Sequence, residues 1–273
     1  MTTNIMTKKG GTWCPGCFNF QILAGVKNVI SKKNPKDFAI VTGIGCHAKI
    51  FDYLNINGLN TLHGRVLPTC LGIKMGNPNL NVIGFSGDGD AYAEGMEHTI
   101  HAARYNSNLK YMVHNNQVFA LTVGQPTPVT ELGVKDKTTP LGVKVHPMNP
   151  LKLMLASGAT FVARVFADPK QVEWVLGEAL KHKGFAFIEI LQPCIIFHPD
   201  KGYKEKTYLL EKTKHDKSNF EQAWKRAGEF NYNELTKIPL GIFYQVQKPV
   251  FEDQLPQIVK LKKEKKSWLD IKR

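Results

Sequence analysis

Residues 82–116 read VIGFSGDGDAYAEGMEHTIHAARYNSNLKYMVHNN, and this stretch decides the fold. It opens with an apolar run at 82–85, passes through a glycine-rich turn into a helical pattern that ends near Tyr105, and closes with a second apolar run at 109–113. Two β-rich runs separated by one helical pattern are typical of a βαβ unit, in which the strands are parallel. The stretch therefore predicts a mostly parallel α/β sheet.

The same alternation continues on both sides of this unit. We expect strands at 38–42, 82–85, 109–113, 161–166 and 185–191. We expect helices at 20–30, at about 91–105, and from an Asp168 N-cap and Pro169 to near Gly184. This order predicts a doubly wound α/β domain over residues 1–200. Residues 201–273 are richer in Lys, Glu, Asn and Tyr, and we expect them to form a basic helix-and-loop extension.

Unusual residues follow four of the expected strands. In doubly wound sheets ligands bind beyond the carboxyl ends of the strands, so these segments predict one functional edge. The segments are GIGC at 43–46, GDGD at 87–90, NN at 115–116 and QPC at 192–194.

The GDGD segment predicts a phosphate and metal site. Its glycines allow a phosphate to approach the backbone at the start of a helix, and Asp88 offers a hard oxygen ligand suited to Mg²⁺. Asn116 follows the next strand, so a right-handed βαβ unit brings it beside Asp88. An EF-hand loop is excluded because Tyr92, Ala93 and Thr99 would occupy its fifth, sixth and twelfth positions. A simple Asp-Gly turn and helix cap is the alternative.

The cysteines predict a metal or redox site rather than disulfides. The amino terminus lacks the apolar segment of a secretory signal, so we expect a cytoplasmic, reducing compartment. Cys14 and Cys17 form one CxxC pair, and Cys46 and Cys194 lie on the expected functional edge. Four thiolates are the ligand set of a [4Fe–4S] cluster, and a structural zinc ion is the alternative. Cys70 lies in an apolar helical context and is expected in the core.

Composition excludes several classes of protein. The 273 residues are 42% hydrophobic and 22% charged, which is typical of a globular chain and not of a disordered one. No apolar run approaches the length of a membrane span, so we expect no membrane partner. The net charge is +13, of which residues 201–273 carry +7. The basic run at 260–266 suits a solvated helix end or an acidic partner, and we expect no nucleic acid because no binding motif accompanies it.

The spacing of GDG and NN resembles the thiamine diphosphate binding motif. The whole pattern resembles the beta subunits of the 2-oxoacid:ferredoxin oxidoreductases, especially of the 2-oxoglutarate and general 2-oxoacid type. The matching segments are WCPGC at 13–17, GIGC at 43–46, HGR at 63–65, GIKMGNP at 72–78, GDGD at 87–90, HAARYN at 101–106 and LTVGQPTP at 121–128. The likeness is strong over about residues 11–200 and weaker in the tail.

The resemblance implies an activity and its cofactors. It implies oxidative decarboxylation of a 2-oxoacid with coenzyme A to acyl-CoA and CO₂, with electrons passing through a [4Fe–4S] cluster to ferredoxin. Thiamine diphosphate and Mg²⁺ would be bound by this chain. A separate alpha subunit would supply the carboxylate that the aminopyrimidine ring requires, so the chain alone would be inactive.

The resemblance also implies roles for individual residues. Mg²⁺ would be bound by Asp88, the Asn116 side chain and the Val118 carbonyl, and the cluster by Cys14, Cys17, Cys46 and Cys194. Contacts to thiamine diphosphate would come from Ile44, Gly45, Cys46, His47, His63, Gly87, Asp88, Gly89, Asp90, Asn116, Ala120 and Leu121.

Three basic residues complete the implied site. His63 and Arg65 would contact diphosphate or substrate, unless they form an ordinary surface pair. Lys49 would meet a substrate carboxylate, unless it is simply solvated. His47 follows Cys46 where the family commonly has a small hydroxyl residue.

Two other classes of protein remain open. A non-redox thiamine diphosphate decarboxylase or synthase subunit with a structural zinc site would share the GDG and NN segments, but has no need for the four cysteines. A zinc-bearing nucleic-acid binding module would use the positive charge, but leaves the βαβ pattern unexplained.

Overall fold

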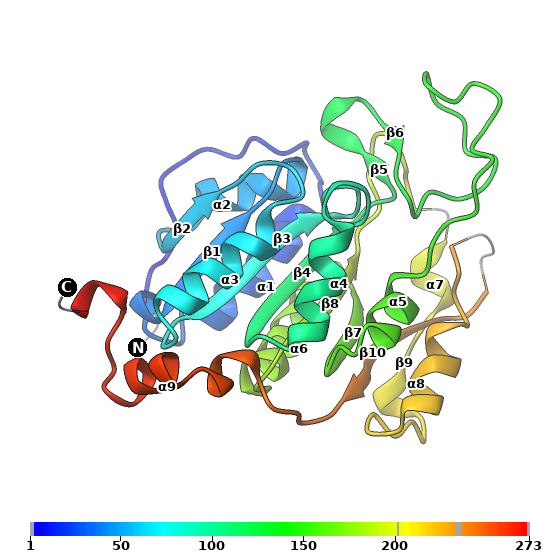
Figure 1. The fold of residues 1–273 in the computed structure, drawn as a ribbon. Coiled ribbons are helices and arrows are strands. Elements are labelled where there is room, and N and C mark those ends of the chain that lie inside the picture. The colour runs from blue at the N-terminus through cyan, green and yellow to red at the C-terminus, as the bar shows by residue number, and fades with distance from the viewer. Residues whose placement is uncertain (1–2, 201, 233–235, 272–273) are drawn as a thin grey trace.

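A central eight-stranded sheet organises the chain in the computed structural model, which describes residues 3–200, 202–232 and 236–271. The strand order is β2-β1-β3-β4-β8-β7-β10-β9 (Figure 1). Neighbours pair in parallel except β10 with β7, which are antiparallel. The strands are β1 (Phe38–Thr42), β2 (Asn57–Asn60), β3 (Asn81–Gly87), β4 (Leu109–Asn115), β7 (Phe161–Phe166), β8 (Ala186–Leu191), β9 (Thr207–Leu209) and β10 (Ile238–Gln245). A separate hairpin joins β5 (Val118–Phe119) to β6 (Gln125–Pro126).

Helices cover both faces of this sheet (Figure 1). Strand side chains alternate between two cores: in β8, for example, Phe187 packs into one core and Ile188 into the other. The helices are α1 (Asn19–Ile30), α2 (Ile50–Tyr53), α3 (Val66–Gly76), α4 (Met96–Tyr105), α5 (Pro150–Ala156), α6 (Pro169–Lys181), α7 (Tyr203–Lys206), α8 (Phe220–Ala227) and α9 (Pro256–Lys263). No helix in these ranges has the length and apolar character needed to cross a bilayer. The doubly wound α/β architecture is confirmed.

Local sequence accounts for most element boundaries. All five expected strands are present, and α6 begins as expected, with the Asp168 side chain accepting hydrogen bonds from the backbone N–H groups of Lys170 and Gln171. The helix expected over 91–105 is instead interrupted. A π-helical segment, Asp90–Glu94, precedes α4 and is separated from it by Gly95. The π-turn lies next to the GDGD segment, and such turns are frequent at functional sites.

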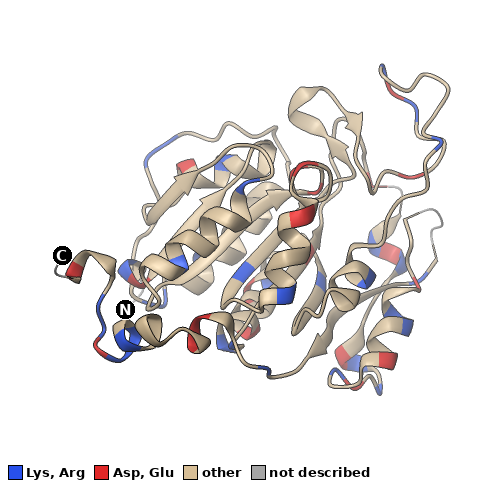
Figure 2. Ribbon diagram, in the orientation of Figure 1, with Lys and Arg blue, Asp and Glu red and all other residues tan. Residues whose placement is uncertain are grey.

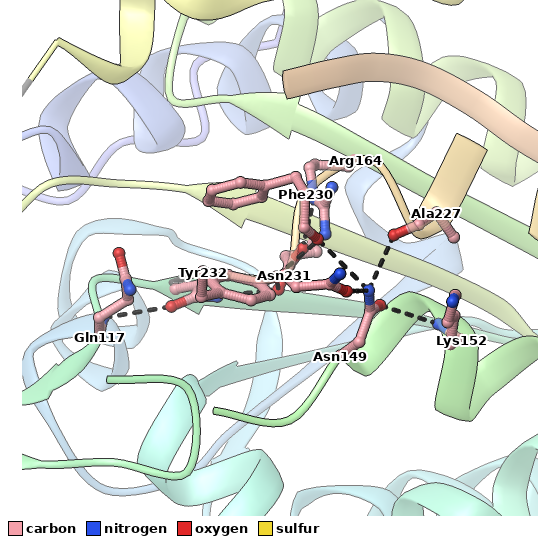
Figure 3. Close-up of polar contacts among 10 residues, drawn as sticks. Gln117, Asn149, Lys152, Arg164, Ala227, Phe230, Asn231 and Tyr232 are labelled. Atoms are coloured by element: carbon pink, nitrogen blue, oxygen red, sulfur yellow. Dashed lines mark hydrogen bonds and ion pairs between the residues drawn. The ribbon is translucent and has the colours of Figure 1, made fainter. Parts of the chain in front are cut away.

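The carboxyl-terminal extension differs from the expectation of helices and loops alone, because it also supplies β9 and β10 to the central sheet. A buried ionic network attaches it there. Arg164 of β7 pairs with Glu189 of β8 at 2.7 Å, and the Tyr232 hydroxyl donates to Glu189 at 2.5 Å. Figure 3 labels Arg164 and Tyr232. Asn149, at the start of α5, donates to the carbonyl of Ala227 in the same view. The extension therefore packs as part of the sheet and its polar core.

The basic run of the extension is solvated. Basic and acidic residues are interspersed along most elements, and a basic run stands out at the end of α9 and in the segment after it (Figure 2). Lys260, Lys262 and Lys263 are exposed, and Lys262 pairs with Asp253 at 3.0 Å. This agrees with a solvated helix end.

Candidate active site

The carboxyl edge of the sheet carries a cavity with an empty volume of about 530 Å³, open solvent at its mouth included. It forms where the segments after β1, β3, β4 and β8 converge, at the edge expected from the sequence. The lining residues are Ile44, Gly45, Cys46, His47, His63, Gly87, Asp88, Gly89, Asp90, His114, Asn116, Val118, Phe119, Ala120, Leu121, Thr122 and Gln192. We call it the cofactor pocket.

Asp88 is a buried carboxylate at the end of β3, with 1% of its surface exposed. One oxygen accepts a hydrogen bond from the Thr127 hydroxyl at 2.5 Å and the other from the Asn116 backbone N–H at 3.3 Å. Burial raises its pKa to about 7, and no ion pair involves it within the described ranges. A buried carboxylate without a cation is costly, so this environment fits a divalent cation bound beside a phosphate.

The turn after β4 brings amide and carbonyl groups beside Asp88. Gln117 has a left-handed backbone, φ +60°, and its N–H donates to the Asn115 side chain at 3.1 Å. The Asn116 side-chain oxygen in turn accepts from the Val118 N–H at 3.1 Å. These bonds hold the turn in place, and Asn116 and Val118 line the cofactor pocket together with Asp88.

Asp90 connects three loops around the pocket. Its carboxylate accepts from the Gly64 N–H and lies 2.8 Å from His63 Nδ1 and 3.6 Å from His47 Nε2. Burial by itself would raise the pKa of Asp90, but the hydrogen bonds from His63 and Gly64 leave it lowered. Burial lowers the pKa of His47 to about 4, whereas the hydrogen bond with Asp90 raises that of His63. Asp90 thus orients His63 at the edge of the pocket.

A second cavity of about 460 Å³ collects the four predicted cysteine ligands. Cys14 and Cys17 lie before α1, Cys46 lies after β1 and Cys194 after β8. All four are free thiols that line this cavity, which we call the cysteine cavity. Cys70 is separate and fully buried in α3, which confirms its place in the core.

The thiols are close enough to influence one another. Burial raises the pKa of Cys46 to about 11, and the charges of the other three cysteines add to the rise while Lys49 opposes it. As the side chains stand, no three His, Cys, Asp or Glu residues in the described part of the chain are arranged to hold a metal ion. The donor set itself, four thiols from three segments, suits an iron–sulfur cluster or zinc.

The two cavities share a wall. Cys46, Asn116, Ala120 and Gln192 line both of them. Cys46 follows Gly45, which lines the cofactor pocket and whose φ of +139° favours glycine. The two cavities therefore adjoin at these four residues.

Two of the predicted basic residues lie elsewhere. Arg65 is exposed, contacts His98 Nε2 at 3.1 Å and lines neither cavity. Lys49 lines the cysteine cavity, where its ammonium group donates to the Thr12 carbonyl at 2.9 Å. Of the three basic residues, only His63 lines the cofactor pocket.

Sequence reasoning assigned no role to several residues of the site. Thr127 lies within the LTVGQPTP segment, and only the folded loop brings its hydroxyl to Asp88. His114 directly precedes Asn115 and Asn116, and its position near the end of a strand could have identified it as a site residue. Gln192 was expected at this edge without a function, and Phe119 packs its ring against Gly89, where a Cβ would lie 2.2 Å away.

Two models of known protein families match consecutive segments of this chain. Residues 43–190 match the family model of the C-terminal TPP binding domain of thiamine pyrophosphate enzymes. Residues 200–260 match the C-terminal model of the pyruvate ferredoxin oxidoreductase beta subunit.

Relatives cover nearly the whole chain. The 2-oxoacid:ferredoxin oxidoreductase subunit beta of Saccharolobus solfataricus is 39% identical, covering 85% of this chain and 81% of the relative. The 2-oxoglutarate synthase subunit KorB of Archaeoglobus fulgidus is 37% identical, covering 92% and 89%. The solved 2-oxoglutarate:ferredoxin oxidoreductase of Magnetococcus marinus, with 2-oxoglutarate, coenzyme A and succinyl-CoA bound, has a TM-score of 0.88 and 32% identity. The match covers 94% of this chain and 89% of that chain.

Proposed function

The chain belongs to the family of 2-oxoacid:ferredoxin oxidoreductase beta subunits, and from this we propose which cofactor each of its two cavities binds. The cofactor pocket binds thiamine diphosphate through Mg²⁺, and the cysteine cavity holds a [4Fe–4S] cluster that passes electrons to ferredoxin. The reaction is the oxidative decarboxylation of a 2-oxoacid with coenzyme A. The shared wall between the two cavities carries this proposal, because electrons must leave the first site for the second.

In this proposal Asp88, the Asn116 side chain and the Val118 carbonyl bind Mg²⁺. Asp88 supplies the negative charge, and Thr127 holds its carboxylate in place. When bound, thiamine diphosphate supplies the carbanion chemistry that releases CO₂. The chain's own contribution is to bind and orient it: Gly87, Gly89 and Asp90 border the diphosphate, while Ala120 and Leu121 support the organic part.

His63 and His47, which both lie beside Asp90, are proposed to contact thiamine diphosphate from the wall of the cofactor pocket. Asp90 orients His63, whose Nδ1 it contacts, and leaves the rest of the ring toward the pocket. Burial keeps His47 neutral, so it packs against the pocket as an uncharged ring. Lys49 borders the cysteine cavity, so we propose that it compensates cluster charge rather than binding a substrate carboxylate. Arg65 remains a candidate for substrate contact only at the outer surface.

An alpha subunit is proposed to close the cofactor pocket. No glutamate lines the pocket in the described part of the chain, and its two carboxylates, Asp88 and Asp90, already have other partners. We propose that the alpha subunit supplies the carboxylate for the aminopyrimidine ring. Apolar side chains around the opening are exposed, including Ile44 and Leu121, as expected of a surface that a partner covers.

We also propose that residues 1–200 form the thiamine diphosphate domain and that residues 201–273 form the extension. The extension's strands complete the sheet on the side away from β2.

Anaerobic purification with and without the alpha subunit tests the proposal. We expect bound iron with brown iron–sulfur absorption, and 2-oxoacid-dependent viologen reduction only when the partner is present. Serine at any of Cys14, Cys17, Cys46 or Cys194 should deplete iron, whereas the matched Cys70→Ala variant should retain it. Stoichiometric zinc without iron would support the non-redox decarboxylase or synthase instead. Full activity of this chain alone would refute the divided site.

A further inference from the structure

The Cys17 sulfur accepts hydrogen bonds from two buried side-chain amides. Asn19 Nδ2 lies 3.5 Å from Cys17 Sγ, and Gln192 Nε2 lies 3.9 Å from it. The Asn19 backbone N–H also donates to this thiol. Asn19 is the first residue of α1 and Gln192 follows β8, and they are only 1% and 2% exposed.

A histidine in the cofactor pocket holds one of these amides. His114 Nδ1 lies 2.8 Å from the Asn19 side-chain oxygen. Because the Asn19 amide nitrogen faces sulfur, its oxygen faces the imidazole and accepts from an Nδ1–H group. Nε2 is buried with no hydrogen-bond partner within the described residues, and His114 lines the cofactor pocket.

The result is a continuous polar connection between the two cavities. It runs from His114 in the cofactor pocket, through the Asn19 amide, to Cys17 in the cysteine cavity. Gln192 lines both cavities and reaches the same sulfur, and its backbone N–H is fixed by the Asn115 carbonyl at 2.8 Å.

The other sulfur atoms are less well supplied with donors. Cys194 accepts from the Phe197 backbone N–H at 3.5 Å. For Cys46 and Cys14, the described residues provide no comparable side-chain amide. The hydrogen bonding is therefore asymmetric and concentrated on Cys17.

We propose that Asn19 and Gln192 are positioning residues that raise the reduction potential of the cluster by hydrogen bonding to Cys17, and that His114 holds Asn19 in its donating orientation. This inference rests on the proposed function, since it requires a cluster on the four cysteines. Reduction adds negative charge to the cluster and its thiolates, and N–H donors stabilise that charge. His114 makes this donor arrangement depend on a side chain of the cofactor pocket.

Redox titration of the complete complex, followed by electron paramagnetic resonance of the reduced cluster, tests the proposal. Asn19→Leu and Gln192→Leu should each move the midpoint to a more negative potential. A tenfold smaller equilibrium constant for reduction corresponds to about 59 mV for a one-electron couple, and we expect a shift of about this size. Gln21→Leu is the matched control, because Gln21 is exposed on the same helix.

Variants of His114 separate positioning from packing. His114→Leu removes the Nδ1–H donor and should shift the midpoint in the same direction. His114→Asn offers an amide N–H in a similar place and should restore much of the wild-type value. Unchanged midpoints in the Asn19 and Gln192 variants with iron intact would overturn this inference alone. A wild-type complex without iron would overturn the proposed function on which it rests.

Discussion

Two buried ionisable side chains lie at opposite edges of the sheet, and they differ in how fully the chain provides their hydrogen bonds. At the carboxyl edge, Asp88 is buried and has hydroxyl and amide partners but no cation within the described residues. At the amino edge, Lys110 is equally buried, and its ammonium group donates to Asn108, to the His182 carbonyl and to the Gly184 carbonyl at 2.7–3.0 Å. Among the described residues, Lys110 has an acceptor for each of its three ammonium donors, whereas each Asp88 oxygen accepts only one hydrogen bond.

Burial moves both groups toward neutrality. It raises the pKa of Asp88 to about 7 and lowers that of Lys110 to about 7. Around Lys110 the carboxyl-terminal segment closes the edge: Asn106 donates to the carbonyls of Lys248 and Pro249, and residues after β10 run along this side of the sheet (Figure 1). A buried group whose hydrogen-bonding positions are all filled by the chain has a structural role, whereas one with unfilled positions can bind a ligand.

The largest expected effect is on the Asp88 side of this comparison. Asp88→Ala should weaken thiamine diphosphate and Mg²⁺ binding by more than about 100-fold, because it removes the carboxylate that faces the cation. Iron bound to the cysteines should be unaffected. Calorimetric titration and iron analysis measure the two effects, with the exposed Asp37→Ala as control. Unchanged cofactor affinity would exclude Asp88 as a ligand.

Acid should have a similar effect on Asp88 without mutation. Its pKa is raised to about 7, and the protonated carboxyl does not bind Mg²⁺. Cofactor affinity should therefore fall as pH falls through about 7, by roughly tenfold per pH unit below it. Titrations between pH 8 and about pH 5.5 measure this slope. A flat profile would show that Asp88 stays ionised in the free chain.

A substitution of Lys110 should instead change the stability of the chain. Lys110→Met leaves two buried carbonyl groups without their donor and should reduce the free energy of unfolding by about 2–4 kcal/mol. Cofactor affinity of the folded variant should remain within about twofold, because Lys110 is at the opposite edge. Denaturant unfolding and calorimetry measure the two quantities. If Lys110→Met weakened cofactor binding without any loss of stability, the structural role given to Lys110 would be wrong.

The smallest effect concerns backbone strain beside the cofactor pocket. Val123 is a β-branched residue with φ +72°, 59% exposed, directly after the Ala120–Thr122 turn. Val123→Gly should stabilise the free chain by about 1 kcal/mol, because glycine adopts this conformation without steric cost. It should also weaken cofactor binding slightly, since the loop becomes less restricted. A loss of stability would mean that Val123 makes packing contacts that outweigh the strain.

Much of the site followed from local sequence. The spacing of GDGD and NN contains one helix and one strand, so the parallel pairing of β3 with β4 brings Asp88 and Asn116 together. The segments carrying Cys46 and Cys194 also follow strands of the same sheet. Hydrophobic periodicity did not predict β10, because its run at 238–245 lies in a charged region. It also did not predict the π-turn after Gly89, because the geometry of that turn depends on loop contacts.

The amino-acid sequence by itself determined the parallel sheet, its functional edge and the ligand types gathered there, because hydrophobic periodicity and strand order are local properties of the chain. Only the tertiary structure decided which side chains touch: Thr127 on Asp88, Asn19 between His114 and Cys17, and Arg65 turned away to His98. These contacts join residues that are mostly tens of positions apart. Their distances depend on how loops pack over the sheet edge, and no spacing along one segment specifies that packing.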